Sequence, residues 1–141
     1  MTDSIRTREA ALIEEFSIFD NWLDRYQYLI DLGRALPEFP ESERRDEDKV
    51  SGCQSQVWLQ ATPVDERVEF RAISDAAIVS GLIAVLMRLY SGAPATEIIA
   101  DNARFVSELG LDQHLSPSRA NGLHAMLQRI RALAAAMAAE Q

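Results

Sequence analysis

The stretch from residue 75 to residue 91 places the strongest constraint on how this chain can fold. Apolar side chains recur there at helical spacing and cover most of the helix surface: Ile78, Val79, Leu82, Ile83, Val85, Leu86 and Leu89. A helix that is apolar on most sides has to be covered by other elements on most sides. The pattern therefore predicts one central, buried helix around which the rest of the chain packs.

Signals at both ends of this stretch define the predicted helix. Ser74 is expected to cap its N-terminus and Gly92 to end it. Gly81 lies inside the pattern and costs about 1 kcal/mol relative to alanine, which indicates that another backbone approaches closely at this position.

Two short segments before the central helix alternate between apolar and polar residues. The apolar positions are Val57, Leu59 and Ala61 in the first segment and Val68, Phe70 and Ala72 in the second. Alternation with a period of two predicts strands, and the connection through residues 62–65 predicts an antiparallel hairpin. A hairpin alone is only marginally stable, so helices must cover its apolar face.

Further helices are predicted on both sides of the hairpin. Before it, residues 12–19 form one amphipathic pattern, and a second helix is expected to start at Asp20, to turn Leu23, Tyr26 and Ile30 inward, and to be capped at its C-terminus by Gly33. Residues 41–49 are almost all charged and are predicted to form a solvated, mobile loop.

After the central helix, three more helical patterns follow. One begins at Pro94 and turns Ile98 and Ile99 inward, one ends at Gly110, and the last begins with Ser116 as its cap and Pro117 as its first residue. The whole chain, residues 1–141, is thus predicted to be a single α+β domain in which a small antiparallel β-sheet packs against several helices.

Charge and composition exclude several classes of partner. The formal net charge is −8, which argues against nucleic acid, because binding to phosphates requires a basic surface. The first ten residues do not resemble a signal peptide, and the apolar run 76–87 is too short to span a membrane. A lone cysteine without an export signal points to the cytoplasm.

Cys53 is the only cysteine in the chain, and it lies between the charged loop and the first predicted strand. It has no second thiol with which to form an internal disulfide, and it cannot contribute to a cysteine-rich metal site. Such a residue is either a small buried hydrophobic group or a nucleophile that reacts with another molecule. The preceding Gly52 allows a sharp turn and leaves room for an approaching partner.

Three kinds of chemistry are considered for Cys53: a thiolate favoured by nearby cations, a cysteine hydrolase, and a metal or cofactor site. Lys49, Arg44 and Arg45 are the cations that would favour the thiolate if they point at it. A cysteine hydrolase would need His114 or His124 as its base, but neither histidine has a spacing that favours this role. Neither a metal site nor a cofactor motif is found.

The segment KVSGCQSQVW at residues 49–58 resembles the signature of the SufE/CsdE family of sulfur acceptors. Three other stretches resemble that family in the same order: RYQYLIDLG at 25–33, SDAAIVSGLIA at 74–84 and HLSPSRANGL at 114–123. The resemblance extends from about residue 16 to residue 134.

The resemblance implies a sulfur relay in iron–sulfur cluster assembly and the fold shared with the IscU scaffold. Cys53 would accept persulfide sulfur from a cysteine desulfurase of the SufS or CsdA type, stimulate that enzyme and pass the sulfur to a cluster scaffold. The chain would need no cofactor of its own, since pyridoxal phosphate belongs to the desulfurase. The alternative is a non-catalytic adaptor that activates the desulfurase without carrying sulfur.

Five further residues are expected to shape the cysteine loop or to contact the partner: Lys49, Gly52, Gln54, Asp75 and Arg119. Asp75 is placed at the start of the central helix, where a carboxylate compensates the helix dipole, worth about 0.3–1 kcal/mol. Arg119 is electrostatically misplaced near a helix N-terminus, which favours a role in binding. Trp58 is expected to be buried under the cysteine loop. Cys53 itself is expected to fold into an apolar recess and to swing out when the partner binds.

Overall fold

The computed structural model describes residues 4–140, which form seven α-helices, two short 3₁₀ turns and a three-stranded antiparallel sheet of order β1-β2-β3. The helices are α1 (Ile5–Phe16), α2 (Trp22–Arg34), α3 (Ala77–Tyr90), α4 (Ala95–Ala100), α5 (Phe105–Glu108), α6 (Leu111–His114) and α7 (Pro117–Ala139). The strands are β1 (Val57–Val64), β2 (Arg67–Ser74) and β3 (Ala93–Pro94), and the 3₁₀ turns are η1 (Glu41–Glu43) and η2 (Asp46–Asp48). The predicted α+β class is confirmed.

The hairpin of β1 and β2 is the framework of the sheet. Its strands pair without interruption from Val57 opposite Ser74 to Val64 opposite Arg67. The predicted hairpin is therefore correct, but β1 includes residues 62–64 of the predicted turn, and the chain reverses at residues 65–66. The two-residue strand β3 was not predicted, because it is too short to show any periodicity.

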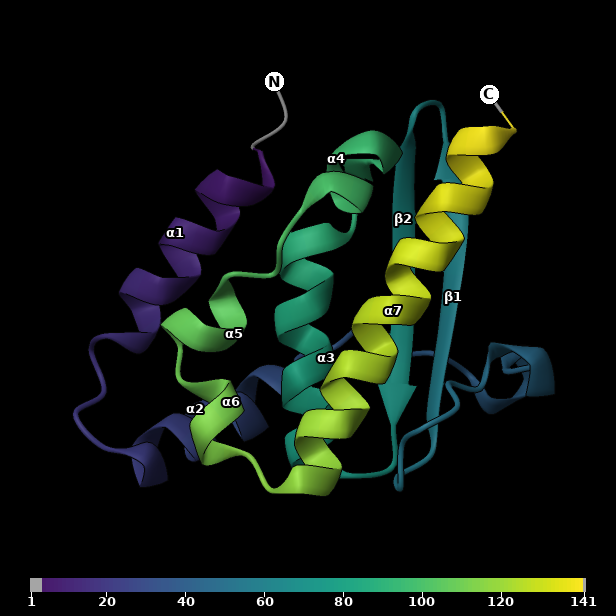
Figure 1. The fold of residues 1–141 in the computed structure, drawn as a ribbon. Coiled ribbons are helices and arrows are strands. Elements are labelled where there is room, and N and C mark those ends of the chain that lie inside the picture. The colour runs from purple at the N-terminus through teal and green to yellow at the C-terminus, as the bar shows by residue number, and fades with distance from the viewer. Residues whose placement is uncertain (1–3, 141) are drawn as a thin grey trace.

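Helix α3 lies at the centre of the molecule, as its apolar surface predicted (Figure 1). Its buried residues are Gly81, Leu82, Ile83, Val85, Leu86, Leu89 and Tyr90. In Figure 1, α7 runs beside α3 and across the hairpin, and α1 lies on the opposite side of α3. The helices thus cover the face of the sheet that carries Val57, Leu59, Val68 and Phe70, all of which are buried.

Two glycines bring the backbones of α2 and α3 together. A Cβ atom on Gly81 would lie 2.2 Å from the carbonyl oxygen of Leu29, and one on Gly33 would lie 2.7 Å from the backbone nitrogen of Gly81. The close approach predicted at Gly81 is confirmed. The prediction that Gly33 caps the end of α2 is wrong, because the helix continues to Arg34 and Gly33 serves helix packing instead.

Several predicted helix ends and faces are also corrected. Asn21, not Asp20, caps α2, because its side chain accepts a hydrogen bond from the backbone N–H of Asp24. Leu23 and Ile99 were predicted to face inward but are 78% and 43% exposed. The sequence signals at Gly110 and Ser116 are confirmed: Gly110 has a φ of 76° between α5 and α6, and Ser116 caps α7.

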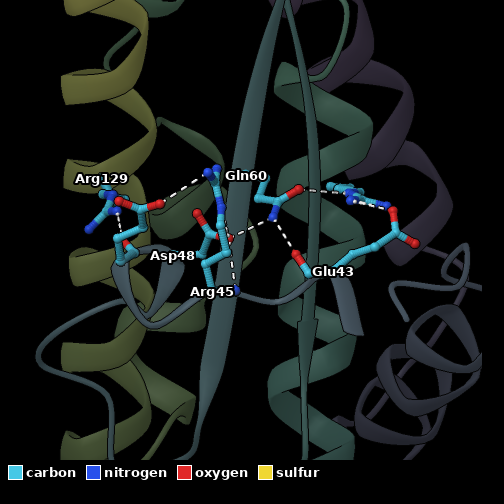
Figure 2. A network of polar contacts seen from close by, with 7 residues as sticks. Glu43, Arg45, Asp48, Gln60 and Arg129 are labelled. Atoms are coloured by element: carbon cyan, nitrogen blue, oxygen red, sulfur yellow. Dashed lines mark hydrogen bonds and ion pairs between the residues drawn. The ribbon is translucent and has the colours of Figure 1, made fainter. Parts of the chain in front are cut away.

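The outer face of the sheet is covered by the charged segment that was predicted to be a solvated loop. Most of its residues are exposed, as predicted, but the segment is not an irregular loop, because it forms η1 and η2 and is tied to the sheet (Figure 2). Asp48 is buried, and its carboxylate accepts a hydrogen bond of 2.6 Å from the Gln60 amide and one of 3.2 Å from the Arg45 backbone N–H. Arg129 of α7 donates to the Glu47 carbonyl at 2.6 Å, so the segment also contacts the longest helix.

Candidate functional site

Cys53 lies in a short irregular segment between η2 and β1. An isolated bridge between Lys49 and Trp58 closes the base of this segment. Gly52 adopts a φ of 93°, a left-handed conformation that a residue with a side chain rarely adopts. The thiol is half-buried, and it donates a weak hydrogen bond to the carbonyl oxygen of Gly122 on α7, at 3.7 Å.

The thiol lines a cavity of about 540 Å³ between the cysteine segment, α2 and the N-terminal ends of α3 and α7. Its apolar wall comes from Ile30, Ile78, Val79, Leu82, Leu123 and Met126, and its polar rim from Gln54, Ser116, Ser118 and Arg119. Cys53 was expected to fold into an apolar recess. In the structure its half-buried side chain lines this partly apolar cavity.

Burial raises the pKa of the Cys53 thiol above its ordinary value. The nearby cations do not offset this effect, because they are engaged elsewhere. Arg44 and Lys49 lie over the ring of Trp58, with 5.1 and 5.6 Å between the charged group and the ring centroid. Arg45 pairs with Glu47 at 3.0 Å and with Asp48 at 3.5 Å. In this conformation burial therefore disfavours the thiolate of Cys53, and none of these three cations is placed to offset that effect.

Trp58 lies on the outer face of the sheet, not under the cysteine segment. Its neighbours on β1, Val57 and Leu59, face the buried core, so Trp58 points the other way and is half-buried beneath Arg44 and Lys49. The expectation of a buried tryptophan beneath the thiol is therefore wrong.

Asp75 was predicted to lie at the start of α3, but it lies outside this helix. Helix α3 begins at Ala77, and Ser74 is the last residue of β2 rather than a helix cap. The Asp75 carboxylate instead accepts a hydrogen bond of 3.1 Å from the backbone N–H of Gln56, and its own N–H donates to the Gln56 carbonyl at 3.4 Å. This pair extends the hairpin by one step and fixes the end of the cysteine segment.

The structure brings some of the predicted site residues together and separates others. Gln54 and Arg119 line the same cavity as Cys53, and the Arg119 backbone N–H donates to the capping Ser116 hydroxyl at 3.3 Å. Lys49 and Asp75 do not line this cavity; they hold the two ends of the cysteine segment.

Neither histidine is among the residues that line the cavity with Cys53. The ring of His114 stacks on Trp22 with 4.1 Å between centroids, and the Tyr26 hydroxyl donates to the His114 carbonyl. His124 lines a different, smaller cavity together with Asn102 and Arg131. Neither histidine is therefore placed beside Cys53 as the base of a cysteine hydrolase would be.

Sequence reasoning missed Gly122, which contacts the sulfur, and Ser118, which lines the cavity. A signal for Gly122 exists, because a glycine inside a long helical pattern often marks a close contact. Ser118 has no comparable signal.

Among residues 4–140, no group of three His, Cys, Asp or Glu side chains is placed so that it could hold a metal ion. Within the same described part of the chain, none of the helices combines the length and apolar character needed to cross a bilayer.

Comparisons with known proteins agree with the arrangement of these elements. A solution structure of a hypothetical protein from Thermus thermophilus superposes with a TM-score of 0.76 at 22% identity, covering 95% of this chain and 97% of the other, which shows a shared fold. An uncharacterized SufE-like protein of Rhizobium etli is 47% identical over 85% of this chain and 84% of its own length. A second from Rhizobium meliloti is 45% identical over 85% and 89%.

The model of the SufE family, described as an Fe-S metabolism associated domain, matches residues 10–134. This match spans the hairpin, the cysteine segment, the central helix and most of α7. The chain therefore belongs to the SufE family and has a role in iron–sulfur metabolism.

Proposed function

We propose that this protein is a sulfur acceptor that carries sulfur as a persulfide on Cys53. The donor is a cysteine desulfurase of the SufS or CsdA type, which the acceptor stimulates by removing sulfur from it, and the recipient is an iron–sulfur cluster scaffold. The observation that carries the proposal is the position of the single cysteine: it lines a cavity of about 540 Å³ on a short segment held at both ends.

The chemistry requires only one nucleophilic sulfur from this chain. The Cys53 thiolate attacks the outer sulfur of the desulfurase persulfide, a new S–S bond forms, and the desulfurase thiolate leaves. No external oxidant or reductant is consumed, because one S–S bond replaces another. Since the chain has one cysteine, no second thiol of the same chain can displace the sulfur before delivery.

The raised pKa of Cys53 suggests when this reaction occurs. A half-buried thiol whose pKa is raised by burial is a poor nucleophile at neutral pH. Docking of the desulfurase would move the cysteine segment out of its recess, restore solvation of the thiolate and so permit attack. The same burial would protect the stored sulfur from other thiols, and an unpaired cysteine suits the reducing cytoplasm.

The proposal is tested with purified desulfurase, free cysteine and the variants Cys53→Ser and Cys53→Ala. After turnover, intact-mass spectrometry of the wild-type protein should show the addition of one sulfur atom that is lost on reduction. Both variants should fold normally, gain no sulfur and fail to stimulate the desulfurase.

The same variants separate the carrier from the non-catalytic adaptor. An adaptor that stabilises an active form of the desulfurase would stimulate it without Cys53. Full stimulation by Cys53→Ser, together with a wild-type protein that never gains sulfur, would exclude the carrier.

A further inference from the structure

The cysteine segment rests on two small residues of α7 that are almost one helical turn apart. Gly122 faces the sulfur: a Cβ atom built on it would lie 3.5 Å from Sγ of Cys53 and 4.0 Å from its Cβ. Ala125 faces the preceding residue: its Cβ lies 3.2 Å from the position that a Cβ on Gly52 would occupy. Two consecutive residues of the segment thus lie against two positions on one face of α7.

We propose that Gly122 and Ala125 are positioning residues, whose small size allows the cysteine segment to rest against α7 and holds the Cys53 thiol half-buried. Gly122 contributes mainly through its carbonyl, which accepts the S–H hydrogen bond at 3.7 Å, while a side chain larger than a methyl group at this position would meet the sulfur. The proposal deepens the sulfur-acceptor function, on which it rests for its biological purpose, but it concerns the resting thiol and can be measured without any partner.

The geometry indicates why bulk at position 125 would release the thiol. Long side chains on a helix lean toward its N-terminus, over the residue three positions earlier. A leucine at 125 would therefore extend toward Gly122, into the space that Cys53 occupies. Gly52, which adopts a φ of 93°, lies so near Ala125 that a single added Cβ atom would be 3.2 Å from the Ala125 Cβ, so the segment has little room to shift around a larger side chain.

The pKa of the Cys53 thiol can be interpreted simply, because few charged groups surround it. Of the residues that line its cavity, only Arg119 on α7 carries a charge, and the lining residues from α2 and α3 are uncharged. The dominant effect on the Cys53 pKa is burial, so a change in seating should appear as a change in that pKa.

The test compares Ala125→Leu with Ala132→Leu, the same substitution at an exposed position of the same helix. The rate of Cys53 alkylation by iodoacetamide is measured from pH 6 to pH 10 on the purified proteins, with circular dichroism to verify the fold. Release of the thiol from its recess lowers its pKa, and each decrease of one pKa unit raises the thiolate fraction about tenfold at neutral pH. A thiolate of lower pKa is also a weaker nucleophile, so the alkylation rate rises only about three- to fourfold per pKa unit. Greater exposure of the thiol adds to this increase.

We expect Ala125→Leu to react at least about threefold faster than wild type at pH 7, with the midpoint of its pH profile moved to lower pH. Ala132→Leu should match wild type. Gly122→Ala should stay within about twofold of wild type, because a contact of 3.5 Å accommodates the added methyl group. A folded Ala125→Leu protein with an unchanged or slower rate would overturn the proposal.

A smaller enlargement, Ala125→Val, keeps the test decisive if leucine prevents folding. Its rate should lie between those of wild type and Ala125→Leu, and a wild-type rate and pH profile would overturn the proposal. If Cys53 never gains sulfur from a desulfurase, the sulfur-acceptor function fails, whereas the alkylation comparison is unaffected.

Discussion

The carboxylate of Asp75 accepts a hydrogen bond from the backbone N–H of Gln56, three residues after Cys53, at 3.1 Å. This contact joins the last residues of the hairpin to the exit of the cysteine segment. Together with the bridge between Lys49 and Trp58, it fixes both ends of the segment while leaving Cys53 between them free of regular structure.

Asp75→Ala should therefore loosen the cysteine segment more than the fold. Asp75 is exposed, so the loss of its hydrogen bond should lower the free energy of unfolding by about 0.5–1.5 kcal/mol. Alkylation of Cys53 should become faster because the segment opens more often. Asp75→Asn, which keeps an acceptor oxygen, should resemble wild type in urea titrations and in alkylation rate. If Asp75→Ala had the same free energy of unfolding and the same alkylation rate as Asp75→Asn and wild type, this role of Asp75 would be refuted.

The reactivity of Cys53 should show the raised pKa of its thiol directly. Because burial raises this pKa, the midpoint of alkylation by iodoacetamide should lie at higher pH in the folded protein than in a peptide of residues 49–58. At pH values between the Cys53 pKa of the unfolded chain and the higher pKa of the folded protein, the folded protein still binds a proton that the unfolded chain has lost. Stability should therefore fall as the pH rises through that window.

Thermal unfolding of wild type and Cys53→Ser at several alkaline pH values tests whether stability falls as the pH rises. The decline with pH should be steeper for wild type, since serine does not titrate there. A midpoint for the folded protein at or below that of the peptide would show that the thiol is not buried in solution.

Gly81→Ala should be one of the most damaging substitutions in the chain. The added methyl group would lie 2.2 Å from the Leu29 carbonyl oxygen, so α2 and α3 would have to move apart. We expect a loss of about 3 kcal/mol or more. Gly92→Ala is the control, since Gly92 has a φ of 82° and open space around it, and it should lose only about 1–2 kcal/mol from backbone strain. Denaturant titrations that give equal losses would contradict the packing argument.

Asp48→Ala should destabilise the protein through the polar contacts that tie η2 to the sheet (Figure 2). The variant would lose the bonds of 2.6 and 3.2 Å to Gln60 and to the Arg45 backbone, and we expect a cost of about 1.5–3 kcal/mol because the carboxylate is buried and charged. Glu43→Ala breaks an exposed ion pair with Arg71 at 3.0 Å and should cost less than about 1 kcal/mol. Similar costs for both variants in urea titrations would disprove the difference between the buried and exposed contacts.

The amino-acid sequence alone determined the α+β class, the hairpin, the buried central helix and the single cysteine. These features depend on periodicity, composition and local signals, which act between residues close in the chain. The apolar surface of residues 78–89 requires burial on most sides, and Ser116 followed by Pro117 starts a helix wherever that helix packs.

Only the tertiary structure decided what surrounds the thiol. Arg44 and Lys49 are near Cys53 in the sequence, yet they lie over Trp58 on the other face of the sheet, because adjacent residues of a strand point to opposite sides. Gly122 and Ala125 are about seventy positions away, but α7 crosses the cysteine segment and places both against it. Burial and contact depend on such long-range packing, so the half-buried position of Cys53 and the direction of its pKa shift could not be derived from its neighbours in the chain.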